Sequence, residues 1–320
     1  MNYIVFDLEW NQSPEGKRCS DERIPFEIIE IGAVKLNEKR EKISEFQTLI
    51  KPQVYNWIHD SIHEVIHVDY KDLMNGIPFP QAVREFLEWC GQDYMFCTWG
   101  LQDLMELQRN MRYYDLLELI PGPVPYYDIQ KLFSWFHENI KLRRSLEYAI
   151  DSLGLQKAKS FHRALEDAEY TAEVFGKMEL AEILPYYSID TYQVPKNRKQ
   201  EIYISYPTYD KYISREFEDR EKIMKDREAV STRCPVCHLP AKRKIRWFIN
   251  NSRMYESISM CQKHGFIKGK VRIRKTDNDT FYAVKTLKLV NEEKAEELRQ
   301  KRESLRKKRR MKEHSEKQVG

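Results

Sequence analysis

The stretch Asn2-Tyr-Ile-Val-Phe-Asp-Leu-Glu-Trp10 places two carboxylates inside an apolar run. Its aromatic and β-branched residues predict a buried β-strand. Because residues two apart in a strand point to the same face, Asp7 and Glu9 are expected to project side by side. Their like charges and the loss of water both oppose ionisation, and a divalent cation with oxygen ligands would relieve this. The alternative is that both side chains face solvent.

The segments that follow predict an α/β domain over residues 1–184, with strands first and then helices that pack on a mixed sheet. No run of residues approaches the roughly 18–20 apolar positions that a membrane span needs. Carboxylates at positions 7 and 9 are also foreign to the apolar core of a signal peptide, so we expect a cytoplasmic protein without a membrane partner. Further strands are expected at 28–36, 42–50 and 94–99, and helices at 57–73, 80–89, 103–113, 128–139, 145–153 and 165–184.

Charge is distributed unevenly along the chain, whose overall net charge is +4. Residues 233–290 hold fourteen Lys and Arg against three Asp and Glu, a net charge of +11, and residues 291–320 add a further +4. The first 232 residues therefore carry a net charge of −11. An acidic part suits a protein that concentrates carboxylates, and a basic part suits a polyanionic partner. We expect a charged linker over 185–232, a small basic domain over 233–290 and a basic tail over 291–320.

Two later segments supply polar side chains that could join the first two carboxylates. Asp103 follows Cys97-Thr-Trp-Gly100, where a buried strand passes into a helix, and strand ends are where α/β folds gather catalytic groups. Its alternative role is a helix N-cap. Asp167 lies in the first turn of a helix, whose dipole favours an anion, and His162 precedes that helix. His162 could take a proton from water, or it could be a partly buried histidine with one hydrogen bond.

Three motifs resemble, in order and spacing, those of the DEDD superfamily of 3′→5′ exonucleases in its His-containing branch. They are Phe6-Asp7-Leu8-Glu9, Trp99-Gly100-Leu101-Gln102-Asp103 and His162-x4-Asp167. The second motif is most similar to the Eri-type RNA exonucleases and the related sporulation-inhibitor group. The resemblance covers about residues 1–184 and implies an RNase H-like fold. It also implies two Mg²⁺ or Mn²⁺ ions, held by Asp7, Glu9, Asp103 and Asp167, with Asp7 bridging the two ions.

In the activity that this resemblance implies, His162 would deprotonate the attacking water. Nucleoside 5′-monophosphates would then leave from the 3′ end of single-stranded nucleic acid, with RNA favoured over DNA. The competing interpretation is a non-catalytic nucleic-acid-binding adaptor that keeps the exonuclease fold as a scaffold.

Contacts to the terminal nucleotide are expected from Trp10, Ile66 and Trp99. Trp10 stands where many members of the family carry a small or hydroxyl residue, and its ring could stack on a base or belong to the core. The segment Ile66–Asp69 replaces a family segment that lines the nucleotide pocket. Three histidines at helical spacing are interpreted as surface or nucleic-acid contacts rather than as a metal site: His59, His63 and His67.

The pairs Cys234-Pro-Val-Cys237 and Cys261-Gln-Lys-His264 predict a structural Zn²⁺ site. Four soft or borderline ligands in two pairs are what tetrahedral zinc requires, and a short segment needs such a staple to fold. With four protein ligands the site has no open position for catalysis. His238 is an alternative ligand, and three reduced thiols in a small core are the alternative to metal. We expect a zinc-ribbon-like domain.

Cations and aromatic rings alternate around these ligands. Cations neutralise phosphates and aromatic rings stack on unpaired bases, which together are the ingredients of single-strand binding. The alternative is a solvated basic surface. Contacts to nucleic acid are predicted from Lys242, Arg243, Arg246, Trp247, Lys270 and Arg272.

Overall fold

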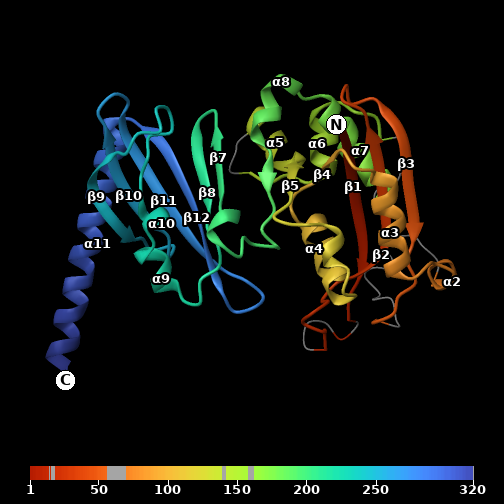
Figure 1. Cartoon of the computed structure of the whole chain (residues 1–320), viewed down its shortest axis with the longest axis horizontal. Coiled ribbons are helices and arrows are strands. Elements are labelled where there is room, and N and C mark those ends of the chain that lie inside the picture. The colour runs from red at the N-terminus through yellow and green to blue at the C-terminus, as the bar shows by residue number, and fades with distance from the viewer. Residues whose placement is uncertain (14, 16–18, 56–69, 139–141, 158–161, 320) are drawn as a thin grey trace. The chain divides into compact units, whose positions relative to one another are not determined.

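The chain divides into two compact units, Met1–Gln193 and Val194–Gly320, in the computed structural model (Figure 1). The structure describes residues 1–13, 15, 19–55, 70–138, 142–157 and 162–319. The expected helix at 57–73 therefore falls almost entirely outside the described residues, and so do Ile66 and the three histidines of that segment. Among the described residues, no helix is long and apolar enough to cross a membrane.

The first unit is built on a mixed six-stranded sheet in the order β3-β2-β1-β4-β5-β6. β1, β2 and β3 form an antiparallel meander, β4 and β5 run parallel to β1, and β6 returns antiparallel at the edge. This mixed sheet with strands first and helices after them confirms the α/β fold class expected for residues 1–184. The strands are β1 Asn2–Asn11, β2 Glu27–Leu36, β3 Lys42–Leu49, β4 Tyr94–Thr98, β5 Pro125–Asp128 and β6 Ser188–Ile189.

Helices cover both faces of this sheet (Figure 1). α3 and α4 pack on one face, and α5, α6 and α7 pack on the other. Short 3-10 turns lie at Leu117–Leu119 and Leu184–Tyr186. The helices are α2 Tyr70–Met74, α3 Phe79–Cys90, α4 Gln102–Tyr113, α5 Ile129–Phe136, α6 Leu146–Ser152, α7 Ala164–Gly176 and α8 Leu180–Ile183.

Strict alternation along β1 decides where its carboxylates point. Phe6 and Leu8 belong to the core beneath α3 and α4, whereas Val5 belongs to the core beneath α5, α6 and α7. Because side chains two apart share a face, Asp7 and Glu9 continue the row of Val5 and face the α7 side. The apolar run in the sequence is therefore buried on both faces, and its two acids lie on one of them.

The start of α7 lies directly against the backbone of β2. Gly32 on β2 stands opposite Asp7 on β1. A Cβ atom at Gly32 would lie 2.0 Å from the backbone nitrogen of Leu165 and 2.1 Å from the carbonyl carbon of Ala164. No side chain could relieve such a clash, because both neighbours are backbone atoms. Glycine at this position thus lets the first turn of α7 approach the strands that carry Asp7 and Glu9.

We expect Gly32→Ala to destabilise the first unit by roughly 1–3 kcal/mol, the usual cost of overpacking, because α7 must move away from the sheet. Gly176→Ala is the matched control, since it lies at the end of the same helix and its Cβ would meet nothing within 4 Å. Chemical denaturation of the two variants and the wild type measures the difference. Equal stability of all three proteins would contradict the close approach.

The second unit is a six-stranded antiparallel sheet in the order β7-β8-β12-β11-β10-β9. α9 and α10 flank it, together with a 3-10 turn at Arg198–Gln200. Its elements are β7 Ile202–Tyr206, β8 Tyr209–Ile213, α9 Arg220–Lys225, α10 Arg227–Val230, β9 Lys242–Ile249, β10 Tyr255–Cys261, β11 Gly265–Lys275, β12 Phe281–Val290 and α11 Glu292–Val319.

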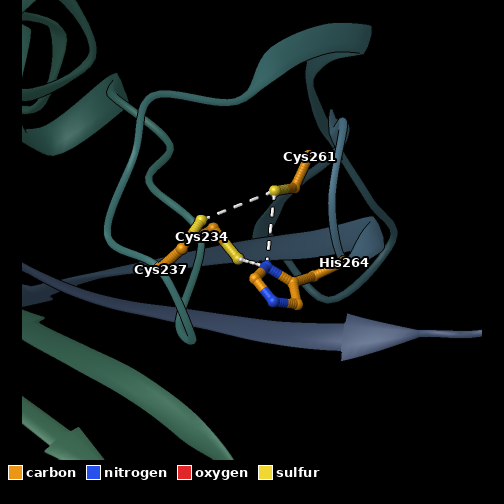
Figure 2. A group of neighbouring side chains, drawn as sticks. All are labelled: Cys234, Cys237, Cys261 and His264. Atoms are coloured by element: carbon orange, nitrogen blue, oxygen red, sulfur yellow. Dashed lines mark hydrogen bonds between the residues drawn. The ribbon is translucent and has the colours of Figure 1, made fainter.

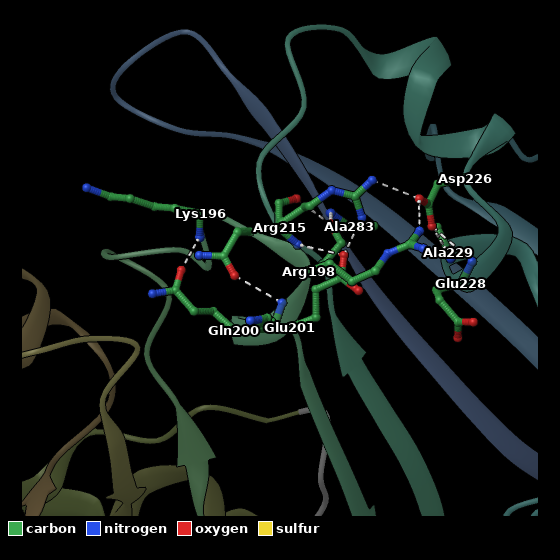
Figure 3. Close-up of polar contacts among 12 residues, drawn as sticks. Lys196, Arg198, Gln200, Glu201, Arg215, Asp226, Glu228, Ala229 and Ala283 are labelled. Carbon is green, nitrogen blue, oxygen red and sulfur yellow. Dashed lines mark hydrogen bonds and ion pairs between the residues drawn. The ribbon is translucent and has the colours of Figure 1, made fainter.

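The segment 185–232 is not the linker that composition suggested. β6 closes the edge of the first sheet, while β7 and β8 enter the second, where β8 pairs with β12. Ion pairs and hydrogen bonds join residues of this segment to one another (Figure 3). Arg215 reaches Glu201 at 2.6 Å and Asp226 at 2.9 Å, and Arg198 also pairs with Asp226 at 3.0 Å. Charged residues of this segment therefore serve ion pairs within a folded unit.

The second unit is also larger than the predicted domain over 233–290. Its sheet needs the strands contributed from 202–213, and the expected tail begins as a packed helix. Ala295 and Leu298 of α11 are buried in one cluster with Ile258 of β10. Lys301 then pairs with Glu256 at 2.6 Å. The first turns of α11 are thus part of the core of this unit.

Candidate functional site

Three carboxylates from two distant parts of the chain meet on the α7 side of the first sheet. Asp7 and Glu9 come from β1, and Asp167 comes from the first turn of α7. One oxygen from each residue lies within 4.8 Å of the others. All three residues are half-buried. Strand alternation aims the first two, and the close approach of α7 to Gly32 brings the third within reach.

The electrostatics of this group disfavour full ionisation. Burial raises the pKa of Glu9 to about 8, with further contributions from Asp167 and Glu30 that Arg163 partly offsets. Burial also raises the pKa of Asp167 to about 6, although the backbone N–H and charge of His162 act in the opposite direction. The pKa of Asp7 lies well above its usual range because of burial and of neighbouring carboxylates. Protons or a cation must compensate such a group.

Asp167 has a spare acceptor in this group. Its Oδ2 accepts a hydrogen bond from the backbone N–H of His162 at 3.2 Å. Its Oδ1 is buried and has no hydrogen-bond partner within the described residues. A buried acceptor without a donor costs about 1–3 kcal/mol, and hard divalent cations bind carboxylate oxygens. The donor set, its spacing and this unpaired oxygen fit a divalent cation.

Asp103 lies near the group without being one of its three members. It stands in the first turn of α4 and is only 5% exposed. Burial raises its pKa to about 7, against the effect of the backbone N–H groups of Asp103 and Leu8. Its charge is the largest carboxylate contribution to the raised pKa of Asp7. The structure therefore places Asp103 close enough to Asp7 to raise its pKa, although Asp103 is not a member of the group of three.

His162 is exposed and lies immediately before α7. Its φ of 68° is in the left-handed region, which is uncommon for residues other than glycine and recurs at functional sites. This conformation directs its backbone N–H to Asp167. The histidine is thus linked to the carboxylate group through its own main chain.

Glu30 and Arg163 support the site and were not predicted from the sequence. Glu30 on β2 lies opposite Glu9 on the neighbouring strand β1, and its side chain is fully buried. Arg163 donates two hydrogen bonds to the Glu30 carboxylate, from Nε to Oε2 at 3.1 Å and from Nη2 to Oε1 at 3.0 Å. Gln47 donates to the same carboxylate at 2.7 Å. Because Arg163 is the N-cap residue of α7, this ion pair fixes the helix start to β2. The one available signal was an acid at position 30 inside an apolar strand.

Two of the predicted nucleotide contacts have packing partners. Trp10 is half-buried, with its ring centroid 5.7 Å from that of Phe26. Trp99 donates its indole N–H to the carbonyl of Arg144 at 3.3 Å and packs against Phe133. Packing accounts for both rings, and their contact with substrate stays a prediction. Ile66 lies outside the described residues.

The second unit holds a Cys₃His cluster at one end of its sheet (Figure 2). The Sγ of Cys234 lies 3.4 Å from Nδ1 of His264, and the Sγ of Cys261 lies 3.7 Å from the same nitrogen. The sulfurs of Cys237 and Cys261 are 3.7 Å apart. Bond lengths of about 2.3 Å to sulfur and about 2.0–2.1 Å to nitrogen give tetrahedral edges of about 3.5–3.8 Å. The four side chains therefore have the spacing of a tetrahedral metal site.

His238, the alternative ligand, is not in this cluster. It is exposed, and its Nδ1 lies 3.9 Å from Asp210. For the thiol of Cys261, burial acts to raise the pKa, but the N–H groups of Lys263 and His264 lower it to about 6. Cys261 is accordingly poised to act as a thiolate ligand.

The predicted basic contacts divide into exposed and packed residues. Lys242, Arg243 and Arg246 are exposed on β9, and Arg272 is exposed on β11, with Lys270 half-buried on the same strand. Trp247 is different. Its indole N–H donates to the carbonyl of Val230 at 2.9 Å, and its ring fills the space beside Gly269, where a Cβ would lie 2.6 Å from it. The ring of Trp247 therefore has packing partners, and the stacking of bases on it stays a prediction.

Comparison with known proteins agrees with the geometry of the first unit. Residues 4–175 match the exonuclease family of the RNase T type, and the chain belongs to this family. It is a DEDD-type exonuclease sequence. It is 31% identical over 159 residues to the PolC-type DNA polymerase III of Thermotoga maritima, covering 47% of this chain and 10% of the polymerase. It is 24% identical over 204 residues to ERI1 exoribonuclease 2 of Xenopus laevis, covering 55% of this chain and 28% of that protein.

Among solved structures, the nuclease domain of 3′hExo, a DEDDh family member bound to rAMP, is similar with a TM-score of 0.49 and 19% identity. The similarity covers 59% of this chain and 96% of that domain. Of the two curated relatives, the chain spans about a tenth of the length of the DNA polymerase III and about a quarter of the length of the exoribonuclease.

The raised pKa values predict a stability that falls as pH rises. The unfolded chain releases these protons near the ordinary carboxyl pKa of about 4, whereas the folded site keeps them to about pH 6–8. The metal-free folded state therefore binds more protons in this window, and its stability decreases from about pH 4 to about pH 8. Mn²⁺ requires deprotonated ligands, so it should raise the melting temperature more at pH 8 than at pH 6.

Melting curves with EDTA or Mn²⁺, for the wild type and Glu9→Gln, measure both effects. Subtracting the melting temperature of Glu9→Gln from that of the wild type at each pH cancels the effect of groups that titrate elsewhere in the chain. We expect the metal-free Glu9→Gln protein to equal or exceed the wild type in stability at pH 8 and to lose most of the Mn²⁺ effect. A wild type that gains stability with pH relative to Glu9→Gln would contradict the assigned electrostatics.

Proposed function

We propose that the chain is a metal-dependent 3′→5′ exonuclease of the His-containing DEDD branch. It would release nucleoside 5′-monophosphates from single-stranded nucleic acid, with RNA favoured over DNA. The observation that carries this proposal is the convergence of Asp7, Glu9 and Asp167 beside the buried carboxylate of Asp103. Membership of the exonuclease family supports the same assignment for residues 4–175.

In this proposal Asp7, Glu9 and Asp167 hold one Mg²⁺ or Mn²⁺. A second ion would be held with the help of Asp103, whose buried carboxylate lies close enough to Asp7 to raise its pKa. When bound, such a pair of ions activates water and neutralises charge on a scissile phosphate. The chain contributes a half-buried setting, in which these charges act more strongly than they would in bulk water.

His162 would serve as the general base that takes a proton from the attacking water. Its exposure allows it to reach solvent and substrate, and its main-chain bond to Asp167 keeps it beside the metal ligands. Glu30 and Arg163 act as positioning residues, because they join β2 to the start of α7. Each side chain then has one role: ligand, base or support.

The adaptor alternative has a physical difficulty. A folded scaffold without catalysis would be more stable if Asp7, Glu9 and Asp103 were apolar or amide residues, since burial and mutual repulsion raise all three pKa values. Carboxylates held at this cost suit a site that binds cations.

Hydrolysis of labelled oligonucleotides tests the exonuclease proposal. With Mn²⁺, a 3′-labelled single strand should release a labelled mononucleotide first, and a 5′-labelled strand should shorten stepwise. Asp7→Asn should lower the rate by at least about 100-fold, because loss of a metal ligand should cost no less than loss of a supporting residue. Glu118→Gln, which removes an exposed carboxylate far from β1 in sequence, is the control.

Comparing the rates of nucleotide release from RNA and DNA strands of the same sequence shows which of the two is the preferred substrate. Asp7→Asn protein that degrades strands at the wild-type rate, or release of nucleotides from the 5′ end, would overturn the assignment.

We further propose that Cys234, Cys237, Cys261 and His264 hold one structural Zn²⁺, and that the basic second unit binds nucleic acid. The spacing of the four ligand atoms supports zinc, and the exposed cations of β9 and β11 support a polyanionic partner. The cluster joins the segment before β9 to the β10–β11 turn, so the metal would close this end of the sheet.

Metal analysis should find one zinc per chain, and His264→Ala should lose it. Because the site ties separate segments together, this variant should also unfold the second unit at a lower temperature while the Mn²⁺ effect on the first unit persists. Cys19→Ser removes an exposed cysteine of the first unit and should leave zinc unchanged. Full zinc content in the His264→Ala protein would refute the proposed ligand set.

A further inference from the structure

Four arginines of the second unit converge on one hollow. Arg220 comes from α9, Arg253 from the β9–β10 turn, and Arg272 and Arg274 from β11. The hollow has a volume of about 570 Å³, within the range of ligand sites in proteins, and it is open to solvent. The remaining lining residues are Ser252, Met254 and Ile273.

These arginines have no carboxylate partner among the described residues. Arg272 directs its Nε to the sulfur of Met254 at 3.1 Å, and Arg220 lies over the ring of Phe281. Other arginines of the same unit form ion pairs, such as Arg215 with Glu201 and Arg299 with Glu296. What distinguishes the hollow is that four arginines line one space without a carboxylate partner among the described residues.

The arrangement has the chemistry of a phosphate site. Guanidinium groups present parallel donors that match phosphate oxygens, and several of them around one space repel each other until an anion enters. Met254 and Ile273 give the hollow an apolar wall, which can cover a sugar or a base next to the phosphate. A ligand with both parts, repeated along a chain, is a polynucleotide strand.

We propose that this arginine hollow binds backbone phosphates of single-stranded nucleic acid, as an anchoring site separate from the carboxylate site of the first unit. The inference deepens the proposed function and rests on it for the identity of the strand. Arg272 is among the nucleic-acid contacts predicted from the sequence. The hollow adds Arg220, Arg253 and Arg274, which come together only in the folded unit.

Binding of a 5′-fluorescein 20-mer RNA, followed by anisotropy with EDTA in an Asp7→Asn background, tests the site without hydrolysis. The test variant is Arg253→Gln with Arg274→Gln. The matched control is Lys294→Gln with Arg299→Gln, which removes the same charge from exposed residues already paired with Glu297 and Glu296. Zinc content and melting curves of each variant establish that the second unit is folded.

We expect the test variant to bind at least 10-fold more weakly than its parent. The slope of log affinity against log salt concentration should fall by about 1.4, because each phosphate contact to a single strand contributes about 0.7. The control should change the slope by much less. Equal losses in the two variants, or none in the test variant, would overturn the proposal.

Competition by a mononucleotide or by inorganic phosphate distinguishes a strand from a small ligand. The proposal requires that neither displaces the 20-mer at concentrations near the strand's own dissociation constant. Displacement there would assign the hollow to a small phosphorylated ligand and overturn the strand assignment. Because hydrolysis plays no part in these measurements, an inactive enzyme with the expected binding would count against the exonuclease proposal alone.

Discussion

The contact between the start of α7 and the backbone of β2 is the constraint on which the first site depends. Helix and strand can approach this closely because Gly32 has no side chain, and the Arg163–Glu30 ion pair holds them together. Asp167 is thereby brought to the face of the sheet where alternation had already placed Asp7 and Glu9. The site is thus a product of backbone packing first and of side-chain chemistry second.

The two units hold groups of opposite charge that are not balanced within the chain. The first unit gathers carboxylates, whose burial raises their pKa values until protons or cations compensate them. The second unit leaves arginines around a hollow without carboxylate partners among the described residues. Each arrangement costs stability in the isolated chain, and each is relieved by a ligand of opposite charge. An exonuclease that works on a polyanion would use both: cations beside the scissile bond and guanidinium groups along the strand.

Periodicity and spacing predicted those features that depend on local pattern. Alternation along β1 predicted that Asp7 and Glu9 share a face, and the paired spacing of Cys234, Cys237, Cys261 and His264 predicted their meeting. Features that depend on long-range packing were missed. The ion pairs of Arg215 made a folded segment resemble a charged linker, because charge in a sequence does not show whether it is paired. The packing of Trp247 was missed as well, because nothing local shows that Gly269 leaves space for its ring.

The buried ion pair of Glu30 also fixes how much charge the first site must neutralise. Because Arg163 already compensates Glu30, the acids left to balance include Asp7, Glu9, Asp103 and Asp167, with Glu166 beside Asp167. Fully ionised, these acids carry more negative charge than a single divalent cation cancels. Monovalent ions would be a poor substitute, since each brings only half the charge of a divalent ion into the same space.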